Sequence, residues 1–122
     1  MKENKFGVLF RHWVMANAPS LINSTFELKQ TATNSISFNC VEEHQVDYSM
    51  AIRWGNKGVL TRVESGSVGC PDYIYLKNGS AFIVIKYLKG FVIIDIDTFN
   101  LEKGKSKSLS WPRACEIAWK VV

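Results

Sequence analysis

Residues 81–96 read Ala-Phe-Ile-Val-Ile-Lys-Tyr-Leu-Lys-Gly-Phe-Val-Ile-Ile-Asp-Ile and form the most hydrophobic part of the chain. Val, Ile, Phe and Tyr dominate this stretch, and these residue types favour strands. The segment 88–90, Leu-Lys-Gly, predicts a turn, so we expect one strand at 81–87 and another at 91–96. Charged residues interrupt the stretch before it reaches the roughly 20 apolar residues that a membrane-spanning helix needs. The sequence therefore predicts two strands of a sheet here and no transmembrane segment.

Strand-like segments also lie at 59–63 and 72–76, just before this region. Residues 77–80, Lys-Asn-Gly-Ser, contain the Asn-Gly pair that is typical of a tight hairpin turn. We therefore expect 72–76 and 81–87 to form a hairpin.

An alternating segment, Ser-Thr-Phe-Glu-Leu-Lys-Gln-Thr, occupies residues 24–31. Because side chains alternate between the two faces of a strand, Phe26 and Leu28 would face one side and Glu27 and Lys29 the other. A short strand that contains Ile36 and Phe38 is expected to follow.

Three segments have the pattern of helices. Apolar residues recur with helical spacing in 3–16, and Glu3 lies within their stripe. A second helix is expected at about 41–54, with Asn39 as its N-cap and Glu42 at the third position. The inward face of this helix would carry Val41, His44, Gln45, Tyr48 and Ile52. A third helix, at about 111–120, would begin near Ser110 with Pro112 in its first turn.

The order of these elements predicts an α/β fold with a single mixed β-sheet flanked by helices. The chain has 122 residues, of which 47% are hydrophobic and 21% charged. This length allows one core, so we expect one domain over residues 1–122. The composition is that of a globular protein and excludes wholesale disorder.

Glu27 and Lys29 carry the clearest chemical signal in the sequence. On a strand they share a face, so a carboxylate and an ammonium group converge. A carboxylate is a hard ligand suited to Mg²⁺, and a neighbouring lysine can stabilise charge that develops on a phosphate. The alternative interpretation is a solvated ion pair, which is the commoner role of such a pair.

The surroundings of this pair resemble a family of nucleases. Phe26-Glu-Leu-Lys-Gln-Thr31, then Asn34-Ser-Ile-Ser-Phe-Asn39, then Glu43-His-Gln45 resemble segments of the RecU-type and phage-type Holliday junction resolvases. These enzymes belong to the PD-(D/E)xK superfamily, whose core is restriction-endonuclease-like. The resemblance covers specific residues from about Glu3 to Tyr48 and only the general pattern beyond.

The resemblance implies a role for several residues. Glu27 would bind the metal, Mg²⁺ or alternatively Mn²⁺, and Lys29 would be the catalytic lysine. Glu3 would correspond to the glutamate of the N-terminal helix that helps to hold metal, although an acid in a first turn also complements the helix dipole. Gln45 would support the lysine or contact DNA, the alternative being a hydrogen bond at a helix–sheet interface.

The sequence departs from the superfamily pattern at one position. The usual aspartate before the Glu-x-Lys strand is absent, because no Asp lies between Glu3 and Glu27. Pro71-Asp72 followed by Val84-Ile-Lys86 offers a second match, but valine stands where its acid should be. Asp95 and Asp97 are expected on one strand face, without a basic partner at motif spacing.

The resemblance implies that the substrate is branched DNA and that the enzyme is a homodimer. A twofold dimer would place two active sites on the two equivalent strands of a four-way junction. A basic cluster is expected to contact DNA phosphates: Lys103, Lys105, Lys107 and Arg113. A solvated basic loop is the alternative for this cluster. Apolar dimer surfaces could come from the strands between 59 and 96 or from the aromatic residues of the first helix.

Other chemistries lack their motifs. The chain has no phosphate-binding GxxxxGK[ST] loop, no GxGxxG motif and no GxSxG elbow. The three cysteines have no CxxC spacing, so neither a structural zinc site nor a disulfide framework is expected, and we expect a cytoplasmic protein of a cell or of a virus-infected host. The predicted function is cleavage of four-way DNA junctions. The alternatives are a catalytically silent branched-DNA-binding module and a nuclease for flaps or duplex ends.

Overall fold

A computed structural model describes residues 5–17, 21, 23–63 and 72–122. The helices found in these residues are α1 (Lys5–Asn17), α2 (Glu43–Trp54), α3 (Ile96–Lys103) and α4 (Trp111–Ile117), with a short 3-10 helix η2 (Phe38–Cys40). The strands are β1 (Ser24–Gln30), β2 (Ser35–Ser37), β3 (Val59–Val63), β4 (Asp72–Leu76), β5 (Ser80–Lys86), β6 (Phe91–Asp95), β7 (Ser108–Ser110) and β8 (Lys120–Val121).

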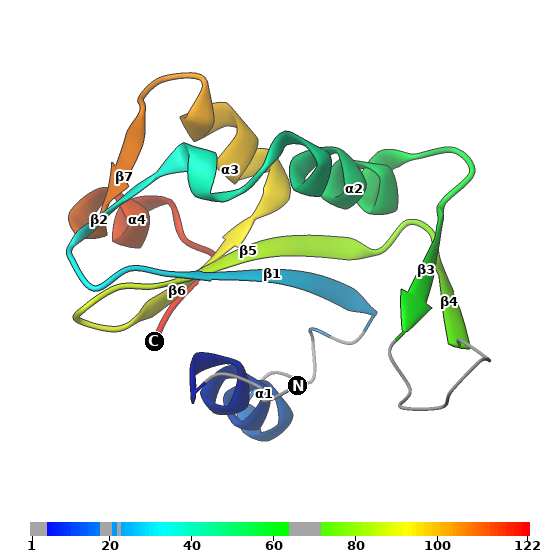
Figure 1. The fold of residues 1–122 in the computed structure, drawn as a ribbon, viewed down its shortest axis with the longest axis horizontal. Coiled ribbons are helices and arrows are strands. Elements are labelled where there is room, and N and C mark those ends of the chain that lie inside the picture. Colours follow the sequence, from blue (N-terminus) through cyan, green and yellow to red (C-terminus); the bar gives the residue numbers. More distant parts are fainter. Residues whose placement is uncertain (1–4, 18–20, 22, 64–71) are drawn as a thin grey trace.

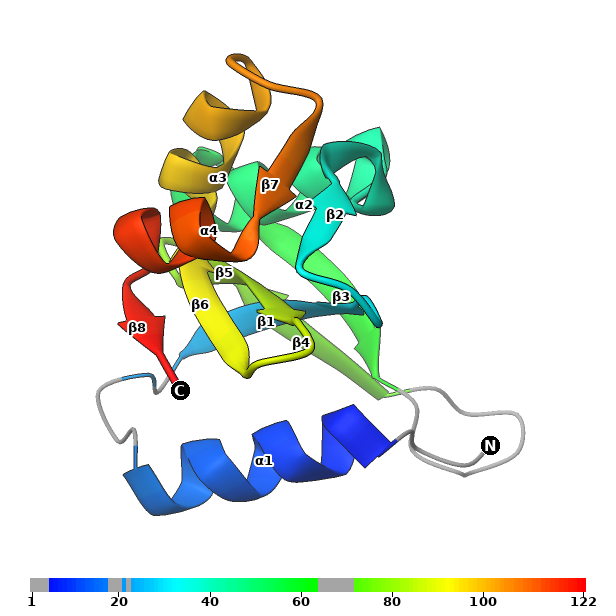
Figure 2. The ribbon, with the colours of Figure 1, turned by 90° about the vertical axis from the view of Figure 1, so that its left-hand side faces the viewer.

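A four-stranded mixed sheet forms the centre of the molecule (Figure 1). Its strand order is β1-β5-β6-β8; β1 and β5 are parallel, whereas the other two pairs are antiparallel. Helix α1 covers one face of this sheet, and α2, α3 and α4 lie over the other (Figure 2). The connection between the parallel strands passes through α2 and the hairpin β3–β4.

Apolar residues from the two faces of β5 and β6 form two separate cores. On the face toward α1 the buried residues are Phe6, Phe10, Leu21, Phe82, Val84, Phe91 and Ile93. On the opposite face the core includes Phe38, Val41, Val46, Ile83, Ile85, Tyr87, Val92, Ile94, Phe99 and Leu109. Strands buried on both sides read as nearly continuous hydrophobic runs, which explains the composition of residues 81–96.

The predicted mixed α/β architecture is confirmed, but the prediction of a single sheet is wrong. Strand β2 pairs with β7, and β3 pairs with β4, so two small two-stranded sheets accompany the central one. The sequence pattern does not predict this division into three sheets, because it contains no information about which strands pair. Alternation predicts that a segment is a strand, whereas its partner depends on contacts across the whole chain.

The hairpin predicted at the Asn-Gly pair is also wrong. Asn78 does adopt the left-handed conformation of a turn, with φ 56°. However, β4 pairs with β3, and the amide of Gly79 donates to the carbonyl of Ile52 at 3.2 Å. The turn therefore redirects the chain from one sheet into another, because β5 has to occupy the doubly covered centre of the large sheet.

The helix predictions differ from the structure in specific places. Helix α1 lies where expected among the described residues, and Ser110 caps α4 with Pro112 in its first turn, as predicted. However, α4 ends at Ile117 and not near residue 120, because Lys120–Val121 form the unpredicted strand β8 beside β6. Helix α2 is capped by Glu42 and not by Asn39, which belongs to η2. Helix α3 was not expected: Asp95 is its N-cap, and its carboxylate accepts from the Asp97 amide, so these acids do not share a strand face.

The inward face of α2 differs from the prediction by one position. Val46, Ser49 and Ile52 are buried, whereas His44 and Tyr48 are exposed. Ile52 is buried as predicted and Gln45 contacts Glu27 on the sheet, whereas Val46 and Ser49 take the places expected for His44 and Tyr48. The angular spacing of residues on a helix is fixed, so the difference comes from how α2 is oriented on the sheet. Within the residues that the structure describes, no helix is long and apolar enough to cross a membrane.

Candidate acid–lysine site on the first strand

The two faces of β1 have opposite characters. Phe26 and Leu28 pack against the core beneath α1. Glu27 and Lys29 lie on the other face, on the side of α2, as their two-residue spacing predicts. Their backbone positions are fixed by in-register pairing with Ile83 and Ile85 of the buried strand β5.

Glu27, Lys29 and Gln45 converge at this face. The Lys29 Nζ lies 3.4 Å from the Glu27 Oε1, and the Gln45 Nε2 donates to the same oxygen at 2.8 Å. The side chains of Lys29 and Glu27 are 23% and 33% exposed. The structure thus brings together the three residues predicted to be catalytic, in a position that is held by neighbours and still open to a ligand.

Gln45 has a second hydrogen bond that fixes its orientation. Its Oε1 accepts from the backbone N–H of Glu42 at 2.9 Å, which completes a capping box at the start of α2. The amide therefore uses its oxygen on the helix and its nitrogen on the carboxylate. The bond from Gln45 to Glu27 is the hydrogen bond at a helix–sheet interface that was one of the two alternatives for Gln45, and it also positions the Glu27 carboxylate.

Cys40 lies close enough to Lys29 for the lysine charge to affect it. Burial raises the pKa of the Cys40 thiol, and the positive charge of Lys29 opposes this shift without overcoming it. A raised thiol pKa disfavours the thiolate, which is the nucleophilic form. The chemistry of this site accordingly rests on the carboxylate and the ammonium group.

Glu27 is the acid that the described part of the site offers to a metal. Nowhere in the described residues do three His, Cys, Asp or Glu side chains gather as a metal-binding group. A single carboxylate fits the way proteins bind Mg²⁺, which keeps several waters and takes further oxygens from substrate phosphates. Glu3, the second predicted ligand, falls outside the described residues.

The alternative match at Asp72 and Lys86 is not assembled as a site. Val84, at the position of the acid, is fully buried in the core beneath α1. Lys86 shares that face by strand alternation, on the opposite side of the sheet from Lys29. The side chain of Asp72 lies outside the described residues.

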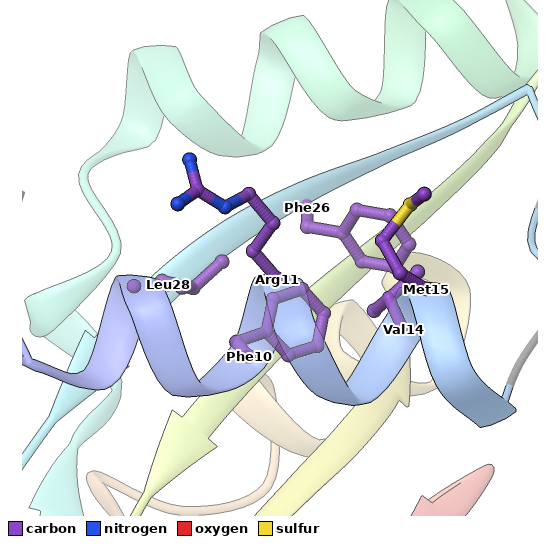
Figure 3. Close-up of a pocket in the computed structure, with 7 residues that line it drawn as sticks. Phe10, Arg11, Val14, Met15, Phe26 and Leu28 are labelled. Atoms are coloured by element: carbon purple, nitrogen blue, oxygen red, sulfur yellow. The ribbon is translucent and has the colours of Figure 1, made fainter.

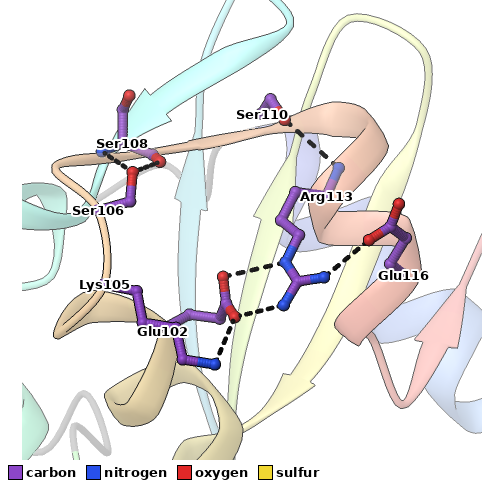
Figure 4. A network of polar contacts seen from close by, with 7 residues as sticks. All are labelled: Glu102, Lys105, Ser106, Ser108, Ser110, Arg113 and Glu116. Carbon is purple, nitrogen blue, oxygen red and sulfur yellow. Dashed lines mark hydrogen bonds and ion pairs between the residues drawn. The ribbon is translucent and has the colours of Figure 1, made fainter.

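The predicted DNA-contacting residues divide into two pairs. Arg113 donates to both oxygens of Glu102, at 2.7 and 3.1 Å, and forms an ion pair with Glu116 at 2.7 Å (Figure 4). Lys105 also lies 3.7 Å from Glu102. Lys103 and Lys107 form no ion pair with any described residue. The charges of Arg113 and Lys105 are therefore largely engaged within the protein, and those of Lys103 and Lys107 are available.

Two of the hollows in the described part of the structure border the predicted sites, and they lie on opposite sides of the central sheet. One, of about 350 Å³, is apolar and lies between α1 and β1, where Phe10, Val14, Met15, Phe26 and Leu28 line it together with Arg11 (Figure 3). The other, of about 400 Å³, is polar and is lined by Ser37, Phe38, Asn39, Lys103, Ser106 and Lys107. The sequence did not single out Ser37, Asn39 or Ser106, because their proximity depends on the unpredicted pairing of β2 with β7.

Comparison of the chain with protein-family models, with curated proteins and with solved structures finds no match. The function is accordingly inferred from the geometry of the site itself.

Proposed function

We propose that the protein is a metal-dependent, structure-selective endodeoxyribonuclease that resolves four-way DNA junctions by phosphodiester hydrolysis. The observation that carries this proposal is the convergence of Glu27, Lys29 and Gln45 on one partly exposed face. The fold class agrees with a restriction-endonuclease-like core, a mixed sheet with helices on both faces. The enzyme would act in the cytoplasm of a prokaryotic cell, including one infected by a phage.

Each residue has a distinct role in this proposal. Glu27 would hold Mg²⁺, or Mn²⁺ in its place, which when bound supplies an activated water and a Lewis acid at the phosphate. Lys29, 3.4 Å from the Glu27 carboxylate, would stabilise the negative charge that develops on a phosphate bound at Glu27. Gln45 is a positioning residue, since its amide restrains the Glu27 carboxylate and does not itself carry charge.

Replacing the carboxylate tests this assignment directly. Glu27→Gln keeps the size of the side chain and removes the charge, so we expect cleavage of a synthetic four-way junction with Mg²⁺ to fall at least about a hundredfold. Lys29→Met should have a similar effect. Glu43→Gln, on an exposed residue of the adjacent first turn of α2, is the control and should leave cleavage unchanged.

The same assay separates the alternatives. Four-way junctions, flaps and linear duplexes are compared with Mg²⁺, with Mn²⁺ and with EDTA. Preferred cleavage of flaps or duplex ends would assign a different nuclease substrate. Junction binding without cleavage in either metal would identify a silent binding module, and metal-dependent cleavage by Glu27→Gln would refute the role of the acid.

The proposal includes a homodimer, because a four-way junction presents two equivalent strands. Of the aromatic residues of α1, Phe6 and Phe10 are buried against the sheet, and Trp13 is only partly buried against the same core. Large exposed side chains remain on the hairpin β3–β4, namely Leu60, Tyr73, Ile74 and Tyr75. Light scattering on the purified protein, alone and with a junction, determines the number of chains in the complex.

A further inference from the structure

The polar hollow beside η2 has the composition of an anion site. Lys103 comes from the end of α3 and Lys107 from the loop before β7, and no carboxylate lines the hollow between them. Neither ammonium group forms an ion pair with a described residue. Two unneutralised positive charges around a cavity of about 400 Å³ favour an anionic ligand.

The lining of the hollow also includes uncharged hydrogen-bonding groups. The Ser37 hydroxyl oxygen accepts a hydrogen bond from the backbone N–H of Asn39 at 3.2 Å, so its own proton is free to donate. The Asn39 side-chain amide has no partner among the described residues. The backbone N–H of Phe38 donates to the carbonyl of Lys107 at 3.1 Å, which holds η2 beside the loop that precedes β7. The hollow is thus built by segments from distant parts of the chain.

The short helix η2 connects this hollow to the acid–lysine site. Its first residues, Phe38 and Asn39, line the hollow, and its last residue, Cys40, is close enough to Lys29 to experience its charge. The chain then enters α2, where Gln45 holds Glu27. The hollow and the acid–lysine site are therefore linked by one short stretch of chain, from η2 to the first turn of α2.

We propose that this hollow binds a backbone phosphate of the nucleic acid. The inference rests on the proposed function for the identity of the polyanion, and it goes further by dividing the basic cluster. Lys103 and Lys107 would contact the phosphate, whereas Lys105 and Arg113 would serve the Glu102 network and contribute little to binding.

Binding of a fluorescent four-way junction, measured by anisotropy in EDTA over a series of salt concentrations, tests the proposal. The double variant Lys103→Ala/Lys107→Ala should lose at least about tenfold in affinity, and its salt slope should fall by about 1 because one phosphate is no longer neutralised. The control, Lys57→Ala/Lys89→Ala, removes the same charge from exposed lysines elsewhere. Affinity and slope equal to those of the control would overturn the subsite.

Two further measurements separate this subsite from the nuclease assignment. Lys103→Arg/Lys107→Arg keeps both charges and should restore binding, and Glu27→Gln should bind the junction without cleaving it. If the pocket variant loses binding while the wild type never cleaves, the subsite stands and the nuclease assignment fails. If the wild type cleaves and Lys103→Ala/Lys107→Ala binds as tightly as the control, the nuclease assignment stands and the subsite fails.

A titration with inorganic phosphate at constant ionic strength tests the anion site without DNA. Amide signals of residues 37–39 and 106–107 in a ¹⁵N-labelled sample should shift on adding phosphate and should not shift in Lys103→Ala/Lys107→Ala. Phosphate shifts in a wild type that binds no DNA would overturn the polynucleotide assignment and identify a site for free phosphate.

Discussion

At the scale of single residues, Glu102 is the most constrained charge in the described structure. Its side chain is 8% exposed, and its carboxylate accepts two hydrogen bonds from Arg113. These hydrogen bonds lower the pKa of Glu102 from its ordinary value of 4.5, and the charges of Arg113 and Lys105 act in the same direction, while burial opposes them. A buried acid of this kind stabilises the fold only while it is ionised.

The sign of the resulting pH dependence follows from the direction of the shift. Because the pKa is lower in the folded state, the stabilisation is fully present above the unfolded pKa and disappears as the pH falls through the folded pKa. We expect Glu102→Gln to lower the urea midpoint at pH 7, and the difference from the wild type to shrink steadily between pH 5 and pH 3. Glu43→Gln, which changes an exposed acid, is the control.

A difference between wild type and Glu102→Gln that stays constant from pH 7 to pH 3 would contradict this account. Such a result would mean that the charge of Glu102 does not cause the difference, which would then come from the poorer hydrogen bonding of an amide beside Arg113. Urea unfolding followed by tryptophan fluorescence gives both midpoints at each pH.

The residue-level predictions succeeded where local geometry determines the outcome. Glu27 and Lys29 share a face because the period of a strand is two, and Ser110 caps a helix because its hydroxyl reaches the next turn. The contact between Gln45 and Glu27 depends in addition on how α2 crosses the sheet. The pairing of Arg113 with Glu102 depends on the placement of two helices, so neither the sequence spacing nor the charge pattern reveals it.

At the scale of elements, α1 depends on its aromatic stripe to stay on the sheet. Phe10 is 5% exposed, and its ring centroid lies 5.0 Å from that of Phe26 and 5.9 Å from that of Phe91. We expect Phe10→Ala to lower the free energy of unfolding by about 3 kcal/mol, because it removes a buried aromatic ring between a helix and a sheet. Chemical denaturation measures this change.

Met15 provides the matched control on the same helix. Its side chain is 83% exposed, so Met15→Ala should change the free energy of unfolding by less than about 0.5 kcal/mol. Equal effects of the two substitutions would show that α1 is not held by the stripe described above.

Elements with strong local patterns were predictable, and those defined by distant contacts were not. Alternation located β1, and hydrophobic runs located β5 and β6, because both signals belong to the segment itself. Helix α3 was not predictable, because residues 96–103 follow a strand directly and the start of the helix depends on the Asp95 side chain. The short segments β2 and β7 are strands only because they pair with each other.

At the scale of the whole molecule, stability is unevenly distributed. Strands β5 and β6 are covered on both faces, whereas β3 and β4 form a two-stranded sheet with large exposed side chains, among them Leu60 and Tyr75. An isolated two-stranded hairpin is marginally stable in water. The hairpin is therefore expected to open separately from the sheet.

Hydrogen exchange measured by mass spectrometry tests this expectation. Amides of β5 and β6 should exchange only through global unfolding, and those of β3 and β4 should exchange orders of magnitude faster through local opening. Adding low concentrations of urea should speed exchange in β5 and β6 and leave the hairpin nearly unaffected. Equal protection of the hairpin and the central strands would show that the hairpin is stabilised by a partner in solution.

The parallel pairing of β1 with β5 also sets the order in which the molecule is assembled. Glu27 lies opposite Ile83 in the register, and all of α2 and the hairpin β3–β4 come between them in the sequence. Loops of this length close late in folding, because their entropy is lost before the contact is gained. A ribosome that has completed α2 has already made Glu27, Lys29 and Gln45, but β5, the strand against which β1 is aligned, has not yet been synthesised. The acid–lysine pair therefore cannot take its final geometry before β5 is made, and a chain terminated before β5 would contain these residues without that geometry.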